Sequence, residues 1–416
     1  MEVDLQEKGI NVLKGKSIWR NSLFVNLWIS SIISGLAFNF YTIALPLMVY
    51  RLTQSTLAMS TLRAIEIFPN IVLGVVIGVL IDRYNRKIFM LSAIGTQIVV
   101  VSFIIVLLSL NDSIGVWGLY ILGFIFFTSS LSYSSAFHAT VPLVVEKDQL
   151  VKANSIRTFS NTLVSIIAPA IAGTVLFTFS YKESLFVTLI GYIFLFLLIL
   201  LSPLPLKSKD TVRQNNFKKE LIEGWRFLLS SQAMWYLTIM ILFVNIASTA
   251  TGGVFIFFSV DVLGVNEQYL GLIIASSAVG GIVASFFANK IKTKFGIKNV
   301  MRFVILSAMF GQLTIFISTN FIYLMIAQFL LGFSVVTINI LYHSLRQALT
   351  PNELQGRVSG TANMIVMLAT PFAYLTAGIV GEFVEVRVIF LASAVIMLLI
   401  FIWMLFINKA LSEVNY

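Results

Sequence analysis

The chain has 416 residues, of which 58% are hydrophobic and 11% are charged, and its mean hydropathy is +0.94. A soluble domain of ordinary composition cannot bury so many apolar side chains, so these values exclude a soluble protein and indicate one solvated by lipid. The net charge of +10 comes from bases between the apolar segments, so it indicates membrane topology and affinity for anionic lipid rather than nucleic-acid binding. The absence of cysteine excludes disulfides and cysteine-based metal sites.

Apolar stretches of about 20 residues, the length that a helix needs to cross a bilayer, recur along the whole chain. They predict an all-α membrane protein, because a β-barrel has shorter, alternating segments. Residues 1–22 are polar, and the apolar stretch after them is too long for the core of a signal peptide. We expect about twelve transmembrane helices, over residues 23–49, 57–81, 88–110, 116–138, 153–179, 184–203, 233–260, 268–289, 299–318, 321–343, 358–380 and 386–407.

Lysine and arginine are concentrated in every second connection between these stretches. Such bases favour the cytoplasmic side, because carrying them across the membrane opposes insertion. The distribution predicts an even number of helices with both termini cytoplasmic. We therefore expect a multi-pass protein of the plasma membrane, the inner membrane of a bacterium.

The longest polar stretch after the N-terminal tail lies near the middle of the chain and is typical of a cytoplasmic linker. Within it, apolar and charged residues from Phe217 to Ser231 recur at helical spacing, which predicts an amphipathic helix on the inner membrane surface. The predicted parts are a tail at 1–22, a six-helix bundle at 23–203, the linker at 204–232, a second six-helix bundle at 233–407 and a tail at 408–416.

The two bundles carry related segments, since PLVVEKDQL follows the fourth span and RQALTPNEL follows the tenth. Parallel repeats of about six helices are a transporter architecture in which the substrate binds near the midplane, between the halves. The pattern therefore predicts two pseudo-symmetric six-helix bundles.

The turn after the second span, GVLIDRYNRK from Gly78 to Lys87, places one acid and three bases between two long apolar segments. It resembles the signature G-x-L-x-D-R-x-G-R-[RK] of the major facilitator superfamily, with Asn85 where glycine is usual. The resemblance implies a twelve-helix secondary transporter. Four further segments resemble the branch of drug:proton antiporters that contains macrolide-efflux proteins and the enterobactin exporter, namely LPLMVYRLTQSTLAMS, LVKANSIRTFSNTLVSIIAPAIAG, IEGWRFL and QALTPNELQGRVSG.

The resemblance also implies that this turn latches the inner side of the two halves in the outward-facing state. Its partner is then the start of the eleventh helix, where TPNE, Thr350 to Glu353, forms a capping box. The alternative is that the bases only anchor the turn on the cytoplasmic side. The latch candidates are Gly78, Asp82, Arg83, Arg86 and Lys87.

The second span contains Arg63 and Glu66, three residues apart and therefore on one helical face, and Glu66 is the only acid within any predicted span. Each charge costs roughly 2.5–3.5 kcal/mol on insertion, so we expect the pair to face the bundle interior or a water-filled cavity. Burial and the neighbouring guanidinium act in opposite directions on the protonation of Glu66. The pair is a candidate for proton coupling or for binding a cationic substrate group. The alternative is a structural ion pair near the outer end of the helix.

In the fifth span, VSIIAPAIAG resembles a weakened form of the antiporter motif G-x-x-x-G-P-x-x-G-G. Pro169 and Gly173 match the motif, and Ala168 and Ala172 stand where it has glycine. Small residues allow close helix packing, and Pro169 bends the helix by removing a hydrogen bond. The alternative is an ordinary kinked interface.

Polar, uncharged residues within the spans either form hydrogen bonds between helices or line a cavity. The family resemblance implies that helices 1, 4, 7 and 10 line the cavity. His138 and His343 end the fourth and tenth spans, so we expect them to cap helices or lie at interfaces rather than relay protons. The cavity candidates are Asn39, Tyr41, Asn245 and Gln328.

No enzyme motif is visible, since the sequence has no G-x-x-x-x-G-K-[ST], no metal-ligand spacing and no nucleophile elbow. We predict a monomeric secondary transporter that needs no cofactor or metal, and exports amphipathic small molecules such as a drug, a macrolide-like antibiotic or a siderophore by proton antiport. Its other partners are membrane lipids. An uptake permease or a lysolipid flippase of the same fold is one alternative. A transport-inactive receptor or scaffold is another, but the short linker and tails offer no soluble output domain.

Overall fold

The computed structural model describes residues 17–110, 115–146, 149–178, 181–204, 217–351 and 354–406. All regular structure in these ranges is helical, which confirms the predicted all-α class. The helices are η1 (Ile18–Arg20), α2 (Ser22–Thr53), α3 (Thr56–Val72), α4 (Gly74–Arg83), α5 (Arg86–Ser109), α6 (Val116–Val144), α7 (Leu150–Thr178), α8 (Tyr181–Leu201), α9 (Phe217–Ser230), α10 (Gln232–Phe257), η3 (Phe258–Val262), α11 (Glu267–Phe295), α12 (Ile297–Phe316), α13 (Phe321–Leu349), α14 (Gln355–Phe383) and α15 (Arg387–Phe406).

Ten of the described helices are long and apolar enough to cross a membrane. The two other spans among the expected twelve are the consecutive pair α3 and α4, and the helix α7. The first turns of α7 are polar and include Lys152, Asn154 and Arg157, which lowers its hydropathy. Six spans therefore precede α9 and six follow it.

The second predicted span is interrupted. Helix α3 ends at Val72 and α4 begins at Gly74, with Leu73 as a turn between them. Pro69 lies one turn before the break and has no N–H to donate within α3, and glycine is the poorest helix former after proline. The sequence predicted one continuous helix here, and the structure has two.

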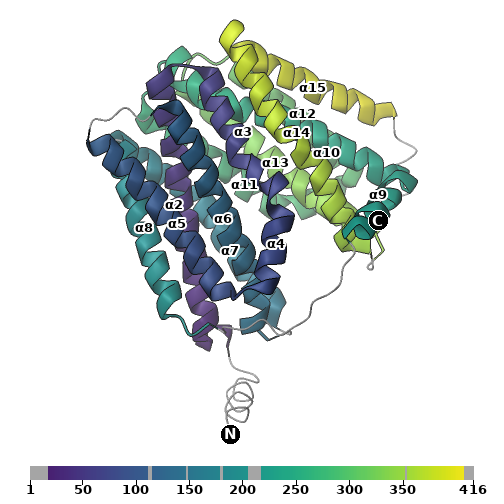
Figure 1. The fold of residues 1–416 in the computed structure, drawn as a ribbon. Helices are drawn as coiled ribbons and strands as arrows, with labels where there is room; N and C mark the ends of the chain where they lie inside the picture. The colour runs from purple at the N-terminus through teal and green to yellow at the C-terminus, as the bar shows by residue number, and fades with distance from the viewer. Residues whose placement is uncertain are drawn as a thin grey trace.

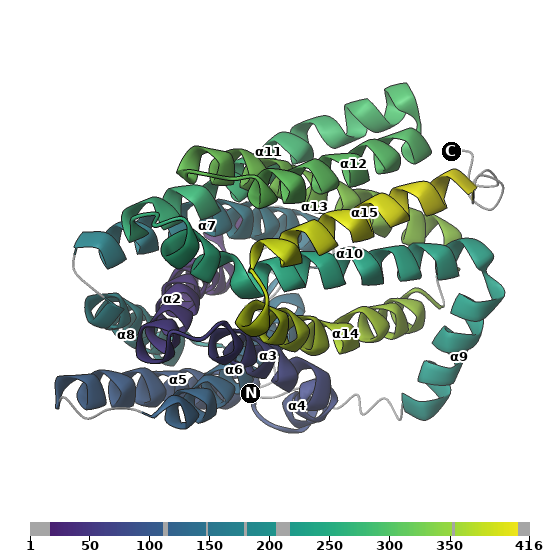
Figure 2. The same ribbon diagram turned by 90° about the horizontal axis from the view of Figure 1, so that it is seen from above.

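The spans form two groups that lie side by side, α2 to α8 and α10 to α15 (Figures 1 and 2). The first group encloses one buried hydrophobic cluster, whose residues run from Ile18 to Leu204. The second group contains two such clusters, from Leu228 to Met404 and from Val254 to Phe390. We call these groups the first half and the second half.

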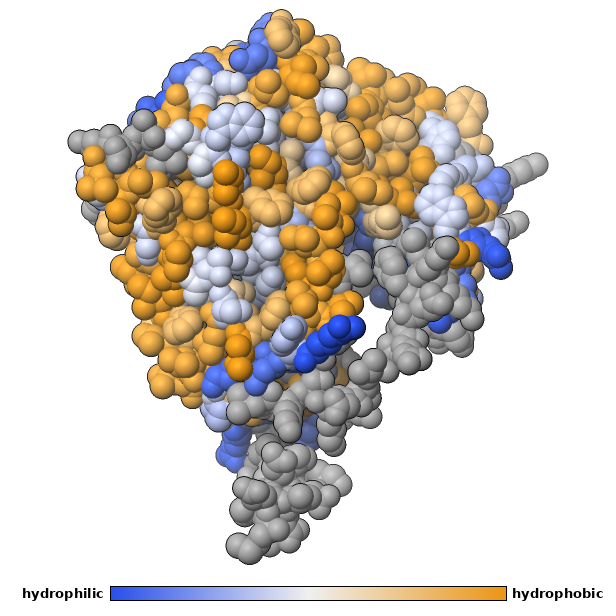
Figure 3. Space-filling model, in the orientation of Figure 1, coloured by the Kyte–Doolittle hydropathy of each residue, from blue (hydrophilic) through white to orange (hydrophobic). Residues whose placement is uncertain are grey.

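The outer surface is apolar over most of the height of the molecule. Figure 3 shows hydrophobic side chains across the middle of this face, with hydrophilic ones gathered toward the ends. Large apolar side chains such as Trp117, Phe286 and Phe372 are exposed there instead of buried. An exposed apolar surface of this extent is typical of a protein that is solvated by lipid.

The halves touch where α3 packs against α14 and α10, and where α7 packs against α11. A small hydrophobic cluster also joins the halves near the end of α2 and the start of α3. We call this the contact end, and we call the opposite end, where Tyr84 and Asn85 join α4 to α5, the turn end. The hydrophobic cluster at the contact end consists of Leu47, Tyr50, Met59, Ile256 and Leu270.

The halves separate toward the turn end. Helix α4 packs against α3, α5 and α6, all of the first half, whereas α14 packs against α9 near its start. Figure 1 shows α3 beside α14 at the top and α4 apart from the lower end of α14, and the view in Figure 2 agrees. The two halves are thus in contact at one end and apart at the other.

Helix α9 forms where the sequence predicts an amphipathic helix. Leu228 is fully buried, while Ile222 is exposed. Glu223 pairs with Arg357 of α14, and Gly224 lies so close to the backbone of α14 that a larger side chain would collide with it. This helix is therefore fixed to the second half.

Candidate functional site

A cavity of about 580 Å³ lies between the two halves. Its wall comes from α2, α3 and α7 of the first half and from α10 to α13 of the second. The volume falls in the range of small-molecule sites, and the wall mixes apolar side chains with hydroxyls and amides. We call it the central cavity, and its polar wall includes Asn39, Arg63, Ser165, Thr251, Gln312 and Gln328.

A second cavity, of about 370 Å³, lies within the first half between α2, α6 and α7. It shares Asn39 and Ser165 with the central cavity, so the two are adjacent. We call it the side cavity. Among the described lining residues of both cavities there is no aspartate or glutamate. The polar wall of the side cavity includes Ser34, Ser130, Ser134, His138, Arg157 and Asn161.

Arg63 and Glu66 form an ion pair. Nη1 of Arg63 lies 2.9 Å from Oε2 of Glu66, and Nη2 donates to the carbonyl oxygen of Thr42 at 3.1 Å. The Glu66 side chain is 3% exposed and that of Arg63 is 20% exposed, so the guanidinium reaches the central cavity and the carboxylate lies behind it. Oε1 of Glu66 is buried without a hydrogen-bond partner in the described part of the chain. The pair lies two turns, about 10 Å, from the start of α3 at the contact end.

Glu382, near the end of α14, accepts three hydrogen bonds from the start of α3. The hydroxyls of Ser55 and Thr56 donate to Oε2 at 3.0 and 3.1 Å, and the backbone N–H of Leu57 donates at 3.3 Å. The first N–H groups of a helix have no partner within it, and the helix dipole favours a negative charge beside them. A carboxylate of one half therefore holds the helix start of the other.

Two further polar contacts join the halves at this end. Tyr50 donates its hydroxyl to Oδ1 of Asp261 at 2.5 Å, and Asp261 lies in the π-helical turn η3 at the end of α10. Such turns are frequent at functional positions. Ser60 donates to the carbonyl oxygen of Gly253 at 3.3 Å. A Cβ at Gly378 would lie 2.6 Å from that of Ser60, so α14 approaches α3 this closely only because residue 378 is glycine.

The bases of the signature turn make their contacts inside the first half. Nη1 of Arg86 donates to the carbonyl oxygen of Ala139 in α6 at 2.8 Å. Nζ of Lys87 donates to the carbonyl oxygens of Leu200 and Ser202 at the end of α8, both at 2.8 Å. Bases near the end of a helix satisfy carbonyl groups that have no partner within the helix. Arg86 and Lys87 therefore connect the turn to α6 and α8 of the same half.

Of the other latch candidates, Gly78 and Arg83 have no polar contact with the second half in the described structure. A Cβ at Gly78 would meet nothing within 4 Å, and Arg83 is exposed. The side chain of Asp82 lies outside the described residues, as do Asn352 and Glu353 of the capping box. The latch stays a prediction about another conformation.

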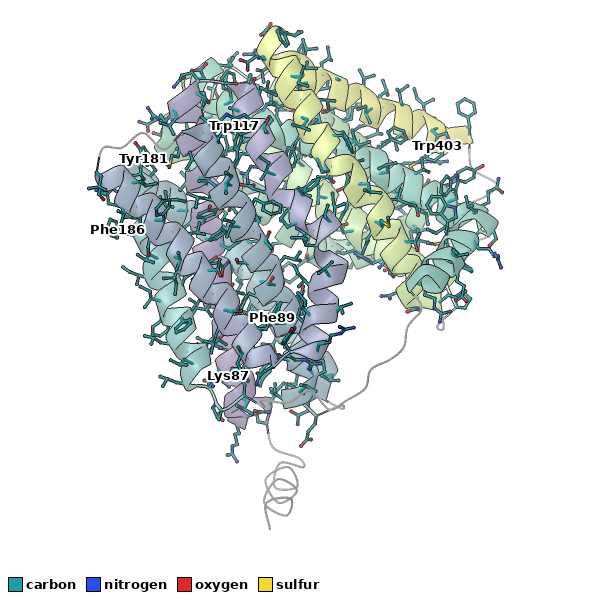
Figure 4. All side chains as sticks on the ribbon, in the orientation of Figure 1. Lys87, Phe89, Trp117, Tyr181, Phe186 and Trp403 are labelled. Atoms are coloured by element: carbon teal, nitrogen blue, oxygen red, sulfur yellow. The ribbon has the colours of Figure 1, made fainter. Side chains whose placement is uncertain are left out.

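The contact of Lys87 with the end of α8 has a counterpart in the second half. Nη2 of Arg302, in α12, donates to the carbonyl oxygen of Met404 near the end of α15 at 3.2 Å, as Lys87 does at the end of α8. Figure 4 labels Lys87 at the turn end, far from Trp117 at the start of α6. A base from the third helix of each half thus contacts the end of the sixth.

The antiporter-like residues lie in α7, which packs against α2 and α11. Ala168 is fully buried, and Pro169 is buried and contributes to the wall of the central cavity. The helix continues through Pro169. The surroundings of Gly173 lie outside the described structure.

Of the four polar cavity candidates, Asn39 and Gln328 line the central cavity. Tyr41 does not, because it is fully buried in the core of the first half, with its ring stacked on Phe126 at a centroid distance of 3.6 Å. Residues two apart on a helix point to different faces, so Asn39 and Tyr41 cannot both face the cavity. Asn245 is not among the described lining residues either, and its amide donates to a carbonyl oxygen one turn earlier in α10.

Both histidines pair with an arginine. Nη1 of Arg157 lies 2.6 Å from Nδ1 of His138, and Nη2 of Arg346 lies 3.1 Å from Nδ1 of His343. A guanidinium only donates hydrogen bonds, so Nδ1 accepts in each case and the ring carries its proton on Nε2. His138 lies on the wall of the side cavity rather than at the end of a helix.

A family model covers most of the chain. The model of the Major Facilitator Superfamily matches residues 27–373 and 246–415. The chain belongs to the major facilitator superfamily. It is therefore a transporter rather than an enzyme, and transporters of this family need no cofactor.

Bacterial transporters are similar to the chain along most of its length. Macrolide efflux protein A of Streptococcus pyogenes is 21% identical over 399 residues, which are 93% of this chain and 96% of the relative. Enterobactin exporter EntS of Escherichia coli is 25% identical over 342 residues, 81% and 80% of the two chains. YfmI of Bacillus subtilis, an uncharacterized MFS-type transporter, is 21% identical over 383 residues, 90% and 94% of the two chains. These relatives confirm the branch that the sequence segments predicted.

Solved structures share the fold. The nucleoside transporter NupG superposes with a TM-score of 0.74 at 13% identity, over 93% of this chain and 99% of its own. An inward-facing bacterial homologue of the lysosomal transporter Spinster gives 0.71 at 13% identity, over 97% and 99%. The major facilitator architecture is thus confirmed, and the protein is a multi-pass protein of the inner membrane.

The sequence did not reveal Asp261 or Glu382. The predicted spans 233–260 and 358–380 end just before these acids, whereas the helices continue to Val262 and Phe383. An apolar segment identified by hydropathy ends at its first charged residue, but the helix continues until its backbone hydrogen bonds end. The signal in the sequence that could have identified Asp261 and Glu382 is an acidic residue within two residues of the end of a predicted span. The pairing of Arg157 with His138 gave no signal, because they lie on different helices.

Proposed function

We propose that the protein exports amphipathic small molecules by alternating access, in exchange for protons. The observation that carries this proposal is a cavity of about 580 Å³ between two halves that are in contact at one end and apart at the other. Rocking of two such halves exposes a site between them to each side in turn. The efflux proteins among the relatives support the outward direction.

In this proposal residues 23–203 and 233–407 move as two bundles joined by the linker at 204–232, with both termini cytoplasmic. The turn end faces the cytoplasm, which its bases Arg86 and Lys87 favour. The conformation described here is then inward-facing, and the latch of Asp82 and the neighbouring bases forms when the turn end closes. One chain contains the whole central cavity, which supports a monomer as the working unit.

Glu66 is the proposed site of proton coupling. It lies on α3, the helix that holds the contact end together, and only one of its two oxygens is paired. Protonation removes the charge that binds Arg63 and so changes the electrostatics beside the interface of α3 and α14. A proton that interacts differently with the two conformations shifts the balance between them.

The test of export is the accumulation of fluorescein, rhodamine 123 and erythromycin in energised cells that make the protein, compared with cells that do not. An exporter lowers the accumulation of at least one compound, and a protonophore abolishes the difference. Raised accumulation contradicts export and favours an uptake permease. Lowered accumulation that survives the protonophore contradicts exchange for protons.

The test of coupling compares Glu66→Gln with Glu385→Gln in the same assay. Glu66→Gln removes the titratable group and keeps its shape, so we expect uphill efflux to be lost while substrate still equilibrates between the two sides. Glu385→Gln is the matched control, because this acid is 67% exposed and pairs with Arg387 inside the second half. Uphill efflux that persists in Glu66→Gln would leave Glu66 only a structural partner of Arg63.

A further inference from the structure

The side cavity offers hydrogen-bond donors and a cation, and no acid is found among its described lining residues. We propose that it binds the anionic group, a carboxylate, sulfonate or phosphate, of an amphipathic organic substrate whose apolar part lies in the central cavity. This inference rests on the proposed function and names the substrate class of the same site.

Arg157 supplies the charge. It is half-buried in α7 on the wall of the side cavity, and its contact is the neutral ring of His138 at 2.6 Å. No carboxylate of the described residues lies within 4.0 Å of it, whereas Arg63 of the central cavity is balanced by Glu66. A partly buried charge without a counter-ion is costly, so an anion that enters from outside is favoured. The charge of the side cavity is therefore set by Arg157.

Hydrogen-bond donors surround this charge. His138 carries its proton on Nε2, because Nδ1 accepts from Arg157. The hydroxyls of Ser34, Ser130 and Ser134 line the same cavity and have no hydrogen-bond partner elsewhere in the described chain. By contrast, the cavity-lining serines 31 and 165 donate to carbonyl oxygens of their own helices. The free donors are suited to the oxygens of an anion.

The adjacent central cavity provides room for an apolar body. Asn39 and Ser165 line both cavities, and the volumes of the central and side cavities are about 580 and 370 Å³. The side of the central cavity formed by the second half carries Phe255, Leu331 and Val335. A molecule with one anionic end and a larger apolar remainder fits a side cavity that carries an unbalanced charge beside a larger cavity with apolar side chains on one wall.

The second half contains the same kind of pair, placed outside the central and side cavities. Arg346 contacts Nδ1 of His343 and lies over the ring of Tyr342, 5.3 Å from its centroid. Neither Arg346 nor His343 is among the described lining residues of the two cavities. Arg346→Gln is therefore a matched control for the loss of an arginine beside a histidine.

The chain has no cysteine, so one introduced thiol is the only thiol in the protein. Its reaction with charged reagents measures the charge of the side cavity without knowledge of the substrate. Ser134→Cys places one thiol on the side-cavity wall, one turn from His138 on α6. In the purified full-length protein in detergent, the thiol is alkylated with the anionic reagent sulfonatoethyl methanethiosulfonate and with its cationic trimethylammonium analogue. Each alkylation rate is divided by the rate at which the same reagent reacts with free mercaptoethanol, which corrects for the intrinsic reactivity of the reagent. The uncharged methyl methanethiosulfonate reports access to the thiol.

We expect the anionic reagent to react faster than the cationic one. Arg157→Gln should lower the ratio of the two rates by about fivefold, the effect of one unit charge on two reagents of opposite sign in a water-filled pocket. Arg157→Lys and Arg346→Gln should leave the ratio unchanged. A ratio that favours the cation in Ser134→Cys alone, or one that Arg157→Gln does not change, overturns the proposal. These rates depend on neither export nor proton exchange, so either proposal can fail alone.

Protection of the same thiol identifies the source of the anion. Fluorescein represents a soluble organic acid, lysophosphatidylglycerol an anionic lysolipid, and rhodamine 123 a cation with the ring system of fluorescein. Slower alkylation by the uncharged reagent in the presence of fluorescein supports a soluble anion, and protection by the lysolipid supports a lipid. Protection by rhodamine 123 alone, or by none of the three at millimolar concentration, overturns the proposal.

Discussion

The pairing of Arg63 with Glu66 shows how this protein holds two charges inside a membrane helix. Their separation by three residues brings Nη1 to 2.9 Å from Oε2, and the carbonyl oxygen of Thr42 takes a second guanidinium donor. Each charge is costly in hydrocarbon, and breaking a buried pair leaves the other charge without compensation. The free Oε1 of Glu66 remains the position where a proton can bind.

Removal of one partner should therefore destabilise the protein more than removal of both. We expect Arg63→Gln to lower the free energy of unfolding by roughly 3–5 kcal/mol, because it leaves the buried carboxylate of Glu66 unpaired. The double variant Arg63→Gln/Glu66→Gln should recover most of that loss. Thermal unfolding in detergent measures the cycle, and additive effects of the two substitutions would show that the two side chains act independently.

At the scale of helices, the contact between α3 and α14 depends on one carboxylate and on small residues. Glu382 accepts the three donors at the start of α3, while Gly378 lets the two helices approach near Ser60. Without water to replace them, hydrogen bonds between helices and close packing provide the association. The same contact must break when the contact end opens.

Glu382→Ala should shift the protein toward opening of the contact end. Hydrogen bonds to a charged group contribute about 2 kcal/mol, so the opening equilibrium should rise by roughly thirtyfold. The thiol of Ser60→Cys reports opening, because Ser60 is 0% exposed in the closed contact. Its rate of alkylation by N-ethylmaleimide should increase in Glu382→Ala.

The control for this measurement is Glu385→Ala. Glu385 is an exposed acid at the same end of the molecule, and it pairs with Arg387 of its own half. We expect no change in the alkylation rate in that variant. An equal increase in both variants would mean that general loss of negative charge, rather than the cap on α3, governs opening.

At the scale of the whole molecule, two halves enclose the central cavity, and they are in contact at one end and apart at the other. The contact end is held by Glu382, by Tyr50 with Asp261 and by a shared hydrophobic cluster. At the turn end, α4 and α14 lie apart (Figure 1). Transport by alternating access requires that the contact end opens and the turn end closes in each cycle.

A cross-link at the contact end should therefore stop transport. A Cβ at Gly381 would lie 3.4 Å from that of Thr56, close to the roughly 3.5–4.5 Å between the Cβ atoms of a disulfide. Oxidation of the double variant Thr56→Cys/Gly381→Cys should abolish efflux, and dithiothreitol should restore it. Each single variant serves as the control, since the chain has no other cysteine. Efflux by the fully cross-linked protein would refute movement of the two halves.

The class and the family of this protein follow from local features of its sequence. Hydropathy over about 20 residues identifies a membrane span without knowledge of its neighbours, since the bilayer rather than a partner helix imposes the length. The signature turn from Gly78 to Lys87 is equally local, and the spacing of Arg63 and Glu66 places them on one face of any helix. The all-α fold, the approximate number of spans, the family and this ion pair were therefore predictable.

The rotation of each helix and the partners of its polar residues were decided only in the tertiary structure. Asn39 and Tyr41 look equivalent in the sequence, yet one lines the central cavity and the other is buried on Phe126. Glu382 meets α3 across more than 300 residues of chain, and Arg157 meets His138 on another helix. Packing between distant segments sets these contacts, and neither hydropathy nor helical period carries that information.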